Sequence, residues 1–443
     1  MKTTEKPDSA SGLVIDSHDV IDSYDAIDSA IDSLAERAFT ALERLVAQPS
    51  TIGNEAGAQE VLALELLESG FVVTRLEIPS DIGEDPAAGV PRVSYAGRYD
   101  LIGERGDAAG SRSLIINGHM DVVPADDTSR WSSPPFSPTR QEGWLIGRGA
   151  GDMKAGFAAG LLAIWALDQA EPGWQNGRLS VVAAIEEEAT GNGTLASARA
   201  GYLADAALLL EPTELEIMLG GIALIWVEIE LEGRAGHAEA ALASVNPIGA
   251  VAPVIAALEM LEAEFNDEHL HGDHADAALA SIEHPYNLNV GTVHAGDWAS
   301  SVPSVARLEV RIGHPTRLNS DETFELVRQR VLAATARDAW FREHPPVLKL
   351  TGYRAERYRQ EPDGEIVTAL AAAHNSAHGK NPELAMIGST TDARFYLNQF
   401  GMPAVAYGPR TRNMHGTDEA VELASIVEVA KTVARFLRTW FRA

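Results

Sequence analysis

At residues 114–121 the chain reads Leu114-Ile115-Ile116-Asn117-Gly118-His119-Met120-Asp121, an apolar run followed by a glycine, a histidine and an acid. An apolar run that ends at a glycine predicts a short buried strand followed by a turn. Two further strand-like runs end at Ile185 and Leu210, and each is followed directly by a glutamate. Open α/β sheets bind ligands at the carboxyl ends of their strands, so these polar residues are expected to converge.

Strand-like and helical segments alternate around this stretch. Apolar residues at spacings of three and four predict an amphipathic helix from Ile21 to near Pro49. The other expected elements are strands at 72–77, 114–117, 179–185, 206–210 and 403–407, and helices at 56–69, 155–169, 194–200, 365–377 and 424–441. The alternation favours a doubly wound mixed sheet of the α/β class.

Between Gly220 and about Tyr353 the pattern changes to longer segments without a candidate ligand motif. The expected elements are strands at 222–231, 288–293, 306–311 and 347–351 and helices at 247–265 and 321–336. We interpret this region as an inserted α+β domain. The expected organisation is therefore an N-terminal extension at 1–34, a main domain formed by 35–221 and 355–443, and an inserted domain at 222–354.

The composition limits the partners and the chemistry of the protein. The 443 residues include 35 basic and 64 acidic side chains, a formal charge of -29, which repels nucleic acid and anionic membrane surfaces. No cysteine is present, so a metal site must use His, Asp and Glu. Residues 1–12 are polar, and the sequence has no run of about 18 apolar residues that could span a bilayer. The sequence therefore predicts a soluble, cytoplasmic protein that binds neither nucleic acid nor membrane.

Five acid or imidazole side chains each lie in a distinct local motif: His119, Asp152, Glu188, Glu211 and His415. Two histidines and three carboxylates suit a pair of divalent metals, because one carboxylate can bridge two ions while each ion takes one histidine and one further carboxylate. A water between such ions becomes a hydroxide nucleophile near neutral pH. If the five residues converge, the chain is predicted to be a hydrolase.

Each motif also has a plainer interpretation. A single histidine after a strand is usually structural, and the glycine-rich segment from Gly147 to Gly156 could cradle a phosphate, although it lacks the Walker spacing and its terminal Lys-Ser/Thr. The acids Glu186-Glu187-Glu188 could be a solvated run, but consecutive acids after a buried strand repel one another unless a cation neutralises them. One of these acids could bind metal while its neighbour serves as general base.

Taken together, these motifs resemble the family of dinuclear zinc amidohydrolases and peptidases that includes acetylornithine deacetylase, succinyl-diaminopimelate desuccinylase, aminoacylase-1 and glutamate carboxypeptidase. The resemblance runs from about Leu42 to the C-terminus. The matching segments, in order, are Gly118-His119-Met120-Asp121-Val122-Val123-Pro124, Trp131 to Phe136, Gly147 to Gly156, Glu186 to Gly193 and Glu211-Pro212-Thr213.

The resemblance implies two divalent metal ions, with zinc expected and cobalt or manganese compatible with the same ligands. The implied roles are Asp152 as the bridge, His119 and Glu211 completing one site, and Glu188 and His415 completing the other. Glu187 is then the general base, and the Asp152–Met153 peptide bond is expected to be cis. Asp121, two residues beyond His119, is expected to point back at the imidazole and fix its tautomer.

The inserted region resembles the lid of this family, which also serves as its dimerisation domain. Within it, Gly233-Arg234-Ala235-Gly236-His237 matches the lid histidine, which implies a homodimer in which His237 polarises the scissile carbonyl of the partner subunit. Substrate contacts are implied for Arg311, Thr391 and Arg394, with an arginine holding the substrate carboxylate. The chain departs from the pattern at Ser300-Ser301, because many members carry an asparagine before the Val-Pro that follows.

The expected activity is a deacylase that cleaves the amide bond of an N-acyl amino acid or a similar small amide bearing a carboxylate. One alternative is a dipeptidase or carboxypeptidase acting on dipeptide-like substrates. Another is a specialised deformylase or aminohydrolase acting on a heteroaromatic amide or amine. A metal-free binding or scaffold protein would be indicated by the loss of a ligand, and none of the five is missing.

Overall fold

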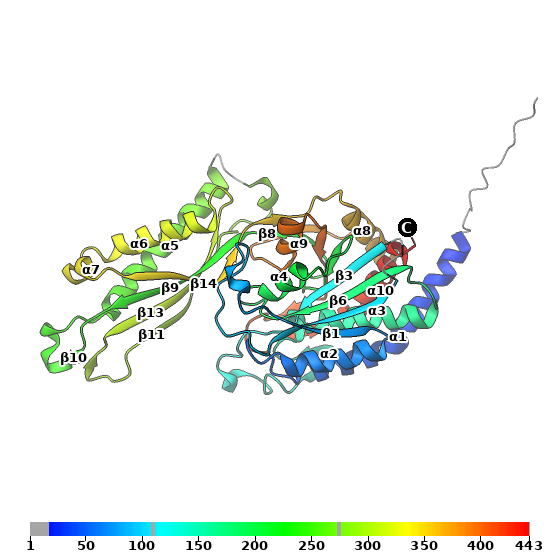
Figure 1. Ribbon diagram of the computed structural model, residues 1–443, viewed down its shortest axis with the longest axis horizontal. Helices are drawn as coiled ribbons and strands as arrows, with labels where there is room; N and C mark the ends of the chain where they lie inside the picture. Colours follow the sequence, from blue (N-terminus) through cyan, green and yellow to red (C-terminus); the bar gives the residue numbers. More distant parts are fainter. Residues whose placement is uncertain (1–16, 108–109, 111, 273–275, 443) are drawn as a thin grey trace, which may run out of the picture.

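The computed structural model describes residues 17–107, 110, 112–272 and 276–442. Residues 1–16, the first part of the expected N-terminal extension, lie outside the described residues. Figure 1 shows two lobes, a larger one built on a nine-stranded sheet and a smaller one built on a four-stranded sheet.

The larger lobe contains the first and last parts of the chain. Its helices are α1 (Ser17–Val46), α2 (Ala56–Glu68), α3 (Ala155–Ala170), α4 (Asn192–Arg199), α8 (Glu365–His378), α9 (Ala393–Phe400) and α10 (Leu423–Trp440). Its large sheet consists of β1 (Val72–Glu77), β2 (Tyr99–Gly106), β3 (Arg112–His119), β6 (Gly177–Ala184), β7 (Ala207–Leu209), β8 (Ile217–Gly221), β15 (Tyr358–Arg359), β16 (Leu384–Ile387) and β17 (Ala404–Ala406). A small sheet is formed by β4 (Thr139–Gln141), β5 (Trp144–Ile146), β18 (Thr411–Arg412) and β19 (Ala420–Glu422).

The large sheet is mixed, with the order β1-β2-β6-β3-β7-β17-β8-β15 and with β16 paired to β8. Strand β3 is parallel to both β6 and β7, whereas β1 and β2 are antiparallel to their neighbours. Helices cover both faces, because Leu114 and Ile116 lie in the core with α1, α3 and α10, whereas Ile115 packs with residues of α4 and α9. The predicted doubly wound mixed sheet is therefore confirmed.

Helix α3 packs very closely against the sheet. A Cβ atom at Gly156 would lie 2.0 Å from the backbone oxygen of Leu210, so only glycine fits at this crossing. The segment Ala150–Ala170, which includes α3, is long and apolar enough to cross a membrane by composition, yet nearly all of it is buried inside the protein. Its apolar surface is covered by α1 and α10, as expected of a core helix.

The smaller lobe carries the second sheet, with the antiparallel order β11-β13-β9-β14. Its elements are β9 (Ala223–Glu232), β11 (Leu288–Ala295), β13 (Val305–His314), β14 (Val347–Ala355), α5 (Ile248–His271), α6 (Ser320–Thr335) and α7 (Ala339–Glu343). Helices α5 and α6 cover one face, where Leu308 and Val310 are buried. Because side chains alternate along a strand, Arg307, Glu309 and Arg311 lie on the opposite face.

A small tip extends the second lobe, formed by β10 (Gly236–His237) paired with β12 (Ser301–Val302). The strands and helices predicted from the sequence all occur, with shifted ends. The elements that were not predicted are mostly short, namely β2, β8, β10, β12, β15, β16, α7, α9 and the small sheet. The expected boundary at residue 34 falls inside α1, in which Ile27 and Ile31 are fully buried in the core of the larger lobe.

Candidate metal centre

The five predicted ligands come from separate elements that end at one edge of the large sheet. His119 is the last residue of β3, Glu188 lies in the turn after β6, and Glu211 lies two residues beyond β7. Asp152 precedes α3, and His415 lies in the loop between β18 and β19. Since β3, β6 and β7 are parallel, their carboxyl ends bring the first three residues together.

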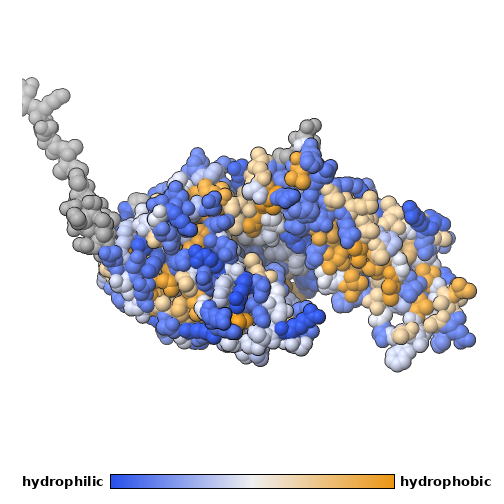
Figure 2. Space-filling model, turned by 180° about the vertical axis from the view of Figure 1, so that it is seen from behind, coloured by the Kyte–Doolittle hydropathy of each residue, from blue (hydrophilic) through white to orange (hydrophobic). Residues whose placement is uncertain are grey.

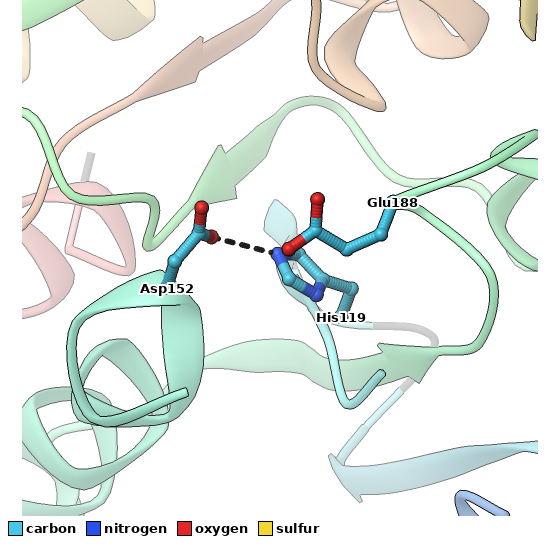
Figure 3. Close-up of side chains that lie close together, drawn as sticks. All are labelled: His119, Asp152 and Glu188. Atoms are coloured by element: carbon cyan, nitrogen blue, oxygen red, sulfur yellow. Dashed lines mark hydrogen bonds and ion pairs between the residues drawn. The ribbon is translucent and has the colours of Figure 1, made fainter. Parts of the chain in front are cut away.

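Asp152 lies at the middle of the group. Its Oδ1 is 3.0 Å from Nε2 of His119 and its Oδ2 is 3.3 Å from Nε2 of His415. On the first side, Oε2 of Glu211 lies 3.8 Å from Nε2 of His119, and on the other, Oε2 of Glu188 lies 3.2 Å from Nε2 of His415. Figure 3 shows Asp152, His119 and Glu188 directed toward one another. The peptide bond between Asp152 and Met153 is cis, as predicted.

The donor atoms suit divalent cations. Nδ1 of His119 donates to the backbone oxygen of Asp121 at 2.8 Å, so Nε2, which faces the carboxylate of Asp152, is the ring nitrogen available to a cation. Burial raises the pKa of Glu187 well above its ordinary value and that of Glu211 to about 8. Chiefly the charge of Glu188 raises the pKa of His415 to about 11. The carboxylates outnumber the imidazoles, and bound cations would neutralise the excess negative charge.

Residues 115–439 match peptidase family M20/M25/M40. The chain belongs to this family. It is 28% identical over 407 residues to N-formyl-4-amino-5-aminomethyl-2-methylpyrimidine deformylase of Bacillus subtilis (strain 168), covering 87% of this chain and 90% of that protein. It is 32% identical over 409 residues to a succinyl-diaminopimelate desuccinylase of Rhizorhabdus wittichii, covering 90% and 96%. The dipeptidase Dug1p of Saccharomyces cerevisiae has the same fold, with a TM-score of 0.78, 15% identity and coverage of 95% and 99%.

Family M20 enzymes are metal-dependent hydrolases that act on amide bonds, and the chain is such a hydrolase. Membership also agrees with the two-sheet architecture of the chain. Its larger lobe carries the candidate metal centre, and its smaller lobe corresponds to the region that the sequence predicted to be the lid.

The carboxylate of Asp121 does not fix the imidazole as we predicted. It lies 3.8 Å from Nδ1 of His119, which instead contacts the backbone oxygen of Asp121. Each carboxylate oxygen of Asp121 accepts a backbone N–H at 3.1 Å, one from Glu187 and one from Glu188. Asp121 is therefore a positioning residue for the turn that carries these two glutamates.

The three consecutive glutamates have three different environments. Glu186 is fully buried, with positive φ, and its carboxylate accepts from Arg98, Tyr95 and Thr190. It is thus a structural acid. Glu187 lies 4.0 Å from Nε2 of His119 and faces the cavity beside the metal centre, and Glu188 contacts His415.

Arg148 and Glu419 form a supporting pair that the sequence reasoning missed. Both are about 1% exposed, and they form an ion pair. Glu419 accepts the backbone N–H groups of Gly151 and Asp152 at 3.0 and 3.1 Å, and Arg148 donates to the backbone oxygen of His415 at 3.2 Å. The sequence did hold a signal for this pair, because both charged residues lie within or beside a ligand motif. A charged residue that is buried there needs a partner of opposite charge.

A cavity of about 530 Å³ runs from the candidate metal centre to the sheet of the smaller lobe, on the face that α5 and α6 do not cover. Figure 2 shows the surface hollowed between the two lobes. The cavity is lined by Glu187, Glu211 and His415 at one end and by Trp226 and Arg311 on the smaller lobe. It is large enough for a small-molecule substrate.

Of the predicted substrate residues, Arg311 and Thr391 line the cavity and Arg394 does not. Arg311 donates to the backbone oxygens of Asn287 and Gly388 at 3.1 Å, and no carboxylate of the described residues forms an ion pair with it. Burial lowers its pKa, so an anionic ligand would be favoured beside it.

The prediction that Arg394 holds the substrate carboxylate is not supported by the structure. Its side chain is 4% exposed and donates to the backbone oxygens of Thr391 and Thr190 at 2.9 and 2.8 Å, with Asp392 also close. These contacts occupy the guanidinium within the protein. The motif match correctly pointed to an arginine as the binding group. Burial, however, determines whether Arg311 or Arg394 is available to a substrate carboxylate.

His237 lies on the exposed β10 tip and does not line the cavity. Its Nδ1 accepts the backbone N–H of Glu239 at 3.2 Å, which leaves Nε2 free of this contact. Ser301, one of the two serines that depart from the family pattern, pairs with His237 across the tip.

Proposed function

We propose that this chain is a dinuclear metal-dependent deacylase that hydrolyses the amide bond of an N-acyl amino acid or a similar small amide bearing a carboxylate. The observation that carries the proposal is the position of Asp152 between two histidine–glutamate pairs, at the end of a cavity whose far side presents an arginine that has no acidic partner among the described residues. Zinc is the expected metal, and cobalt or manganese would suit the same ligands.

In this proposal His119 and Glu211 would hold one ion, Glu188 and His415 would hold the other, and Asp152, which lies between the two pairs, would be a shared ligand. The ions would polarise the amide carbonyl and lower the pKa of the attacking water. Glu187 faces the cavity beside these ligands, so it is placed to take a proton from that water and return it to the leaving nitrogen. Asp121 and Tyr353 hold Glu187 in position through its backbone N–H and carbonyl groups.

Arg311 is the proposed binding group for the substrate carboxylate. Two of its N–H groups bond to backbone oxygens, which fixes the guanidinium while other N–H groups remain for a ligand. Thr390 and Thr391 also line the cavity, and Oγ1 of Thr390 is buried without a hydrogen-bond partner among the described atoms. A carboxylate between Arg311 and Thr390 would satisfy both.

The proposed active unit is a homodimer in which the partner subunit contributes His237 to the carbonyl oxygen. Helix α5 supports this, because Ile248, Ala252, Ala256 and Met260 are exposed at a spacing of four and form an apolar stripe. Strand β11 lies at an edge of its sheet. Figure 2 also shows hydrophobic residues gathered on the smaller lobe.

A second candidate is a deformylase or aminohydrolase for a heteroaromatic substrate. The aromatic wall of the cavity favours it, since Trp226 and Tyr353 pack edge to face with ring centroids 5.4 Å apart. The B. subtilis relative is named for such a deformylation. A shared screen separates the candidates, because a deformylase would cleave formylated aminomethyl-pyrimidines in preference to N-acetyl and N-succinyl amino acids.

The test combines metal analysis with a screen of N-acetyl, N-formyl and N-succinyl amino acids and dipeptides. Glu187→Ala should lose at least about 100-fold in kcat while keeping its metal, and the exposed Glu283→Ala should match the wild type. Full activity of Glu187→Ala or of metal-stripped protein would refute the mechanism. Mixing His237→Ala with Glu187→Ala should restore activity through hybrid dimers, and no recovery after confirmed subunit exchange would refute the shared site.

The proposal places the enzyme in the cytoplasm, where small amino-acid derivatives are available as substrates. Cell fractionation with activity measurement tests the location.

A further inference from the structure

One loop of the larger lobe closes the side of the cavity. Residues 88–95, called the strap here, hydrogen-bond to both lobes. Gly89 exchanges two hydrogen bonds with the side chain of Asn192, at 2.9 and 3.1 Å. Val90 exchanges two backbone hydrogen bonds with Gly352 of the smaller lobe, at 2.7 and 3.1 Å. The strap is therefore held in place on both sides of the cavity.

Arg92 extends from the strap to the open face of the four-stranded sheet. Its Nη2 lies 2.8 Å from Oε1 of Glu309, and its guanidinium carbon lies 5.5 Å from the ring centre of Trp226. All three side chains line the cavity. Arg92 is 30% and Glu309 27% exposed, so the pair is partly shielded from solvent. The two charges cancel, and the wall next to the indole is neutral as a whole.

This wall lies next to the proposed carboxylate-binding residue Arg311. Glu309 and Arg311 are two residues apart on β13, so their side chains project from the same face about 7 Å apart. A substrate whose carboxylate binds Arg311 would bring the side chain of its amino acid toward Glu309. This step rests on the function proposed above.

We propose that Arg92, Glu309 and Trp226 form the specificity wall of the enzyme and select N-acyl amino acids with an uncharged, apolar or aromatic side chain. A neutral side chain can pack on the indole and leave the Arg92–Glu309 pair intact. A charged substrate side chain would lie beside a residue of the same charge, either Arg92 or Glu309. It could form an ion pair with the other residue only by breaking the Arg92–Glu309 pair. The wall thus disfavours both acidic and basic side chains.

Single substitutions that unmask one charge test this. Glu309→Gln leaves Arg92 unpaired, so kcat/KM for N-acetylglutamate relative to its neutral isostere N-acetylglutamine should rise about tenfold. Arg92→Met leaves Glu309 unpaired, so kcat/KM for N-acetyllysine relative to N-acetylnorleucine should rise about tenfold. The double variant should return both ratios toward the wild-type values.

The chain offers a matched control on the same sheet face. Glu230 pairs with Arg307 at 2.8 Å, neither residue lines the cavity, and Glu230→Gln should leave both ratios unchanged. Ratios within twofold of wild type in all wall variants, with folding confirmed by the unfolding temperature, would overturn the proposal. Affinities of free glutamate, glutamine, lysine and norleucine, measured by calorimetry, should shift in the same directions. If the wild type cleaves none of these amides but the affinities for the free amino acids shift as expected, the deacylase assignment is refuted. The proposed charge selectivity of the Arg92–Glu309–Trp226 wall is then still supported.

Discussion

Glu419→Gln is the most informative change at the metal centre, because it alters a charge that touches no substrate. Glu419 accepts two backbone N–H groups, from Gly151 and Asp152, and is paired with Arg148. Glutamine can keep the backbone contacts through its amide oxygen but leaves the guanidinium without a counter-charge. Both side chains are 1% exposed, so breaking the pair should cost about 3–5 kcal/mol of unfolding free energy.

The same change should weaken metal binding, because it removes the charge that holds Arg148 against the backbone oxygen of His415 and leaves a weaker, neutral acceptor for the N–H of Asp152. Weakening such supporting contacts reduces metal affinity by about 10- to 100-fold. Urea unfolding of the metal-free protein measures the first effect, and competition with a chelator measures the second.

The exposed pair of Arg75 and Glu60 provides a control, since Glu60→Gln should cost less than about 1 kcal/mol and leave metal affinity unchanged. The double variant Arg148→Met, Glu419→Gln should regain at least about 1 kcal/mol, because it contains no buried unpaired charge. It should not regain the metal affinity. A loss below about 1 kcal/mol in Glu419→Gln, with metal binding as in the wild type, would refute the reasoning.

Three further changes test other parts of the structure. Tyr353→Phe removes the hydroxyl that donates to the backbone carbonyl of Glu187, so kcat should fall about tenfold with KM within twofold, and an unchanged kcat would contradict this role. Gly156→Ala should cost more than about 3 kcal/mol in urea unfolding because its Cβ would overlap a backbone oxygen, whereas Gly249→Ala, with open space around it, should cost nothing. Burial lowers the pKa of His374 from 6.5 to about 4, so the unfolded chain takes up a proton first as the pH falls. The contribution of His374 to stability should therefore fall below about pH 6.5, by about 1 kcal/mol per unit, and level off below about pH 4, so the unfolding free energy of the wild type relative to His374→Asn should decline over this range.

The sequence predicted that the five side chains converge, because each one lies in a distinct local motif. His119, Glu188 and Glu211 lie within three residues of the end of an apolar run, and parallel strands must bring their carboxyl ends to one edge. The substrate-binding arginine was harder to predict. Arg311 and Arg394 both donate to two backbone oxygens, but Arg311 lines the cavity, whereas Arg394 is buried away from it and pairs with Asp392.

The three consecutive glutamates also show that contacts between distant residues cannot be predicted from the local sequence. Sequence places Glu186, Glu187 and Glu188 side by side, and repulsion between them argues for a cation. The structure adds that Glu186 turns away with positive φ and is neutralised by Arg98, a residue 88 positions earlier. Long-range partners of this kind leave no local pattern, so spacing and charge alone did not separate the three acids, and the roles expected of Glu187 and Glu188 came from the family resemblance.

Two acids support the metal centre in the same way, and neither was assigned this role from the sequence. Asp121 accepts the N–H groups of Glu187 and Glu188, and Glu419 accepts those of Gly151 and Asp152. Each ligand-bearing turn has left regular structure, so its buried N–H groups need acceptors. A carboxylate that binds two successive N–H groups fixes the backbone from which the ligand side chain projects. The geometry of the centre therefore depends on acids that face the backbone as much as on those that face the metals, and conservative amide substitutions at Asp121 and Glu419 should reduce metal affinity although neither residue is a proposed ligand.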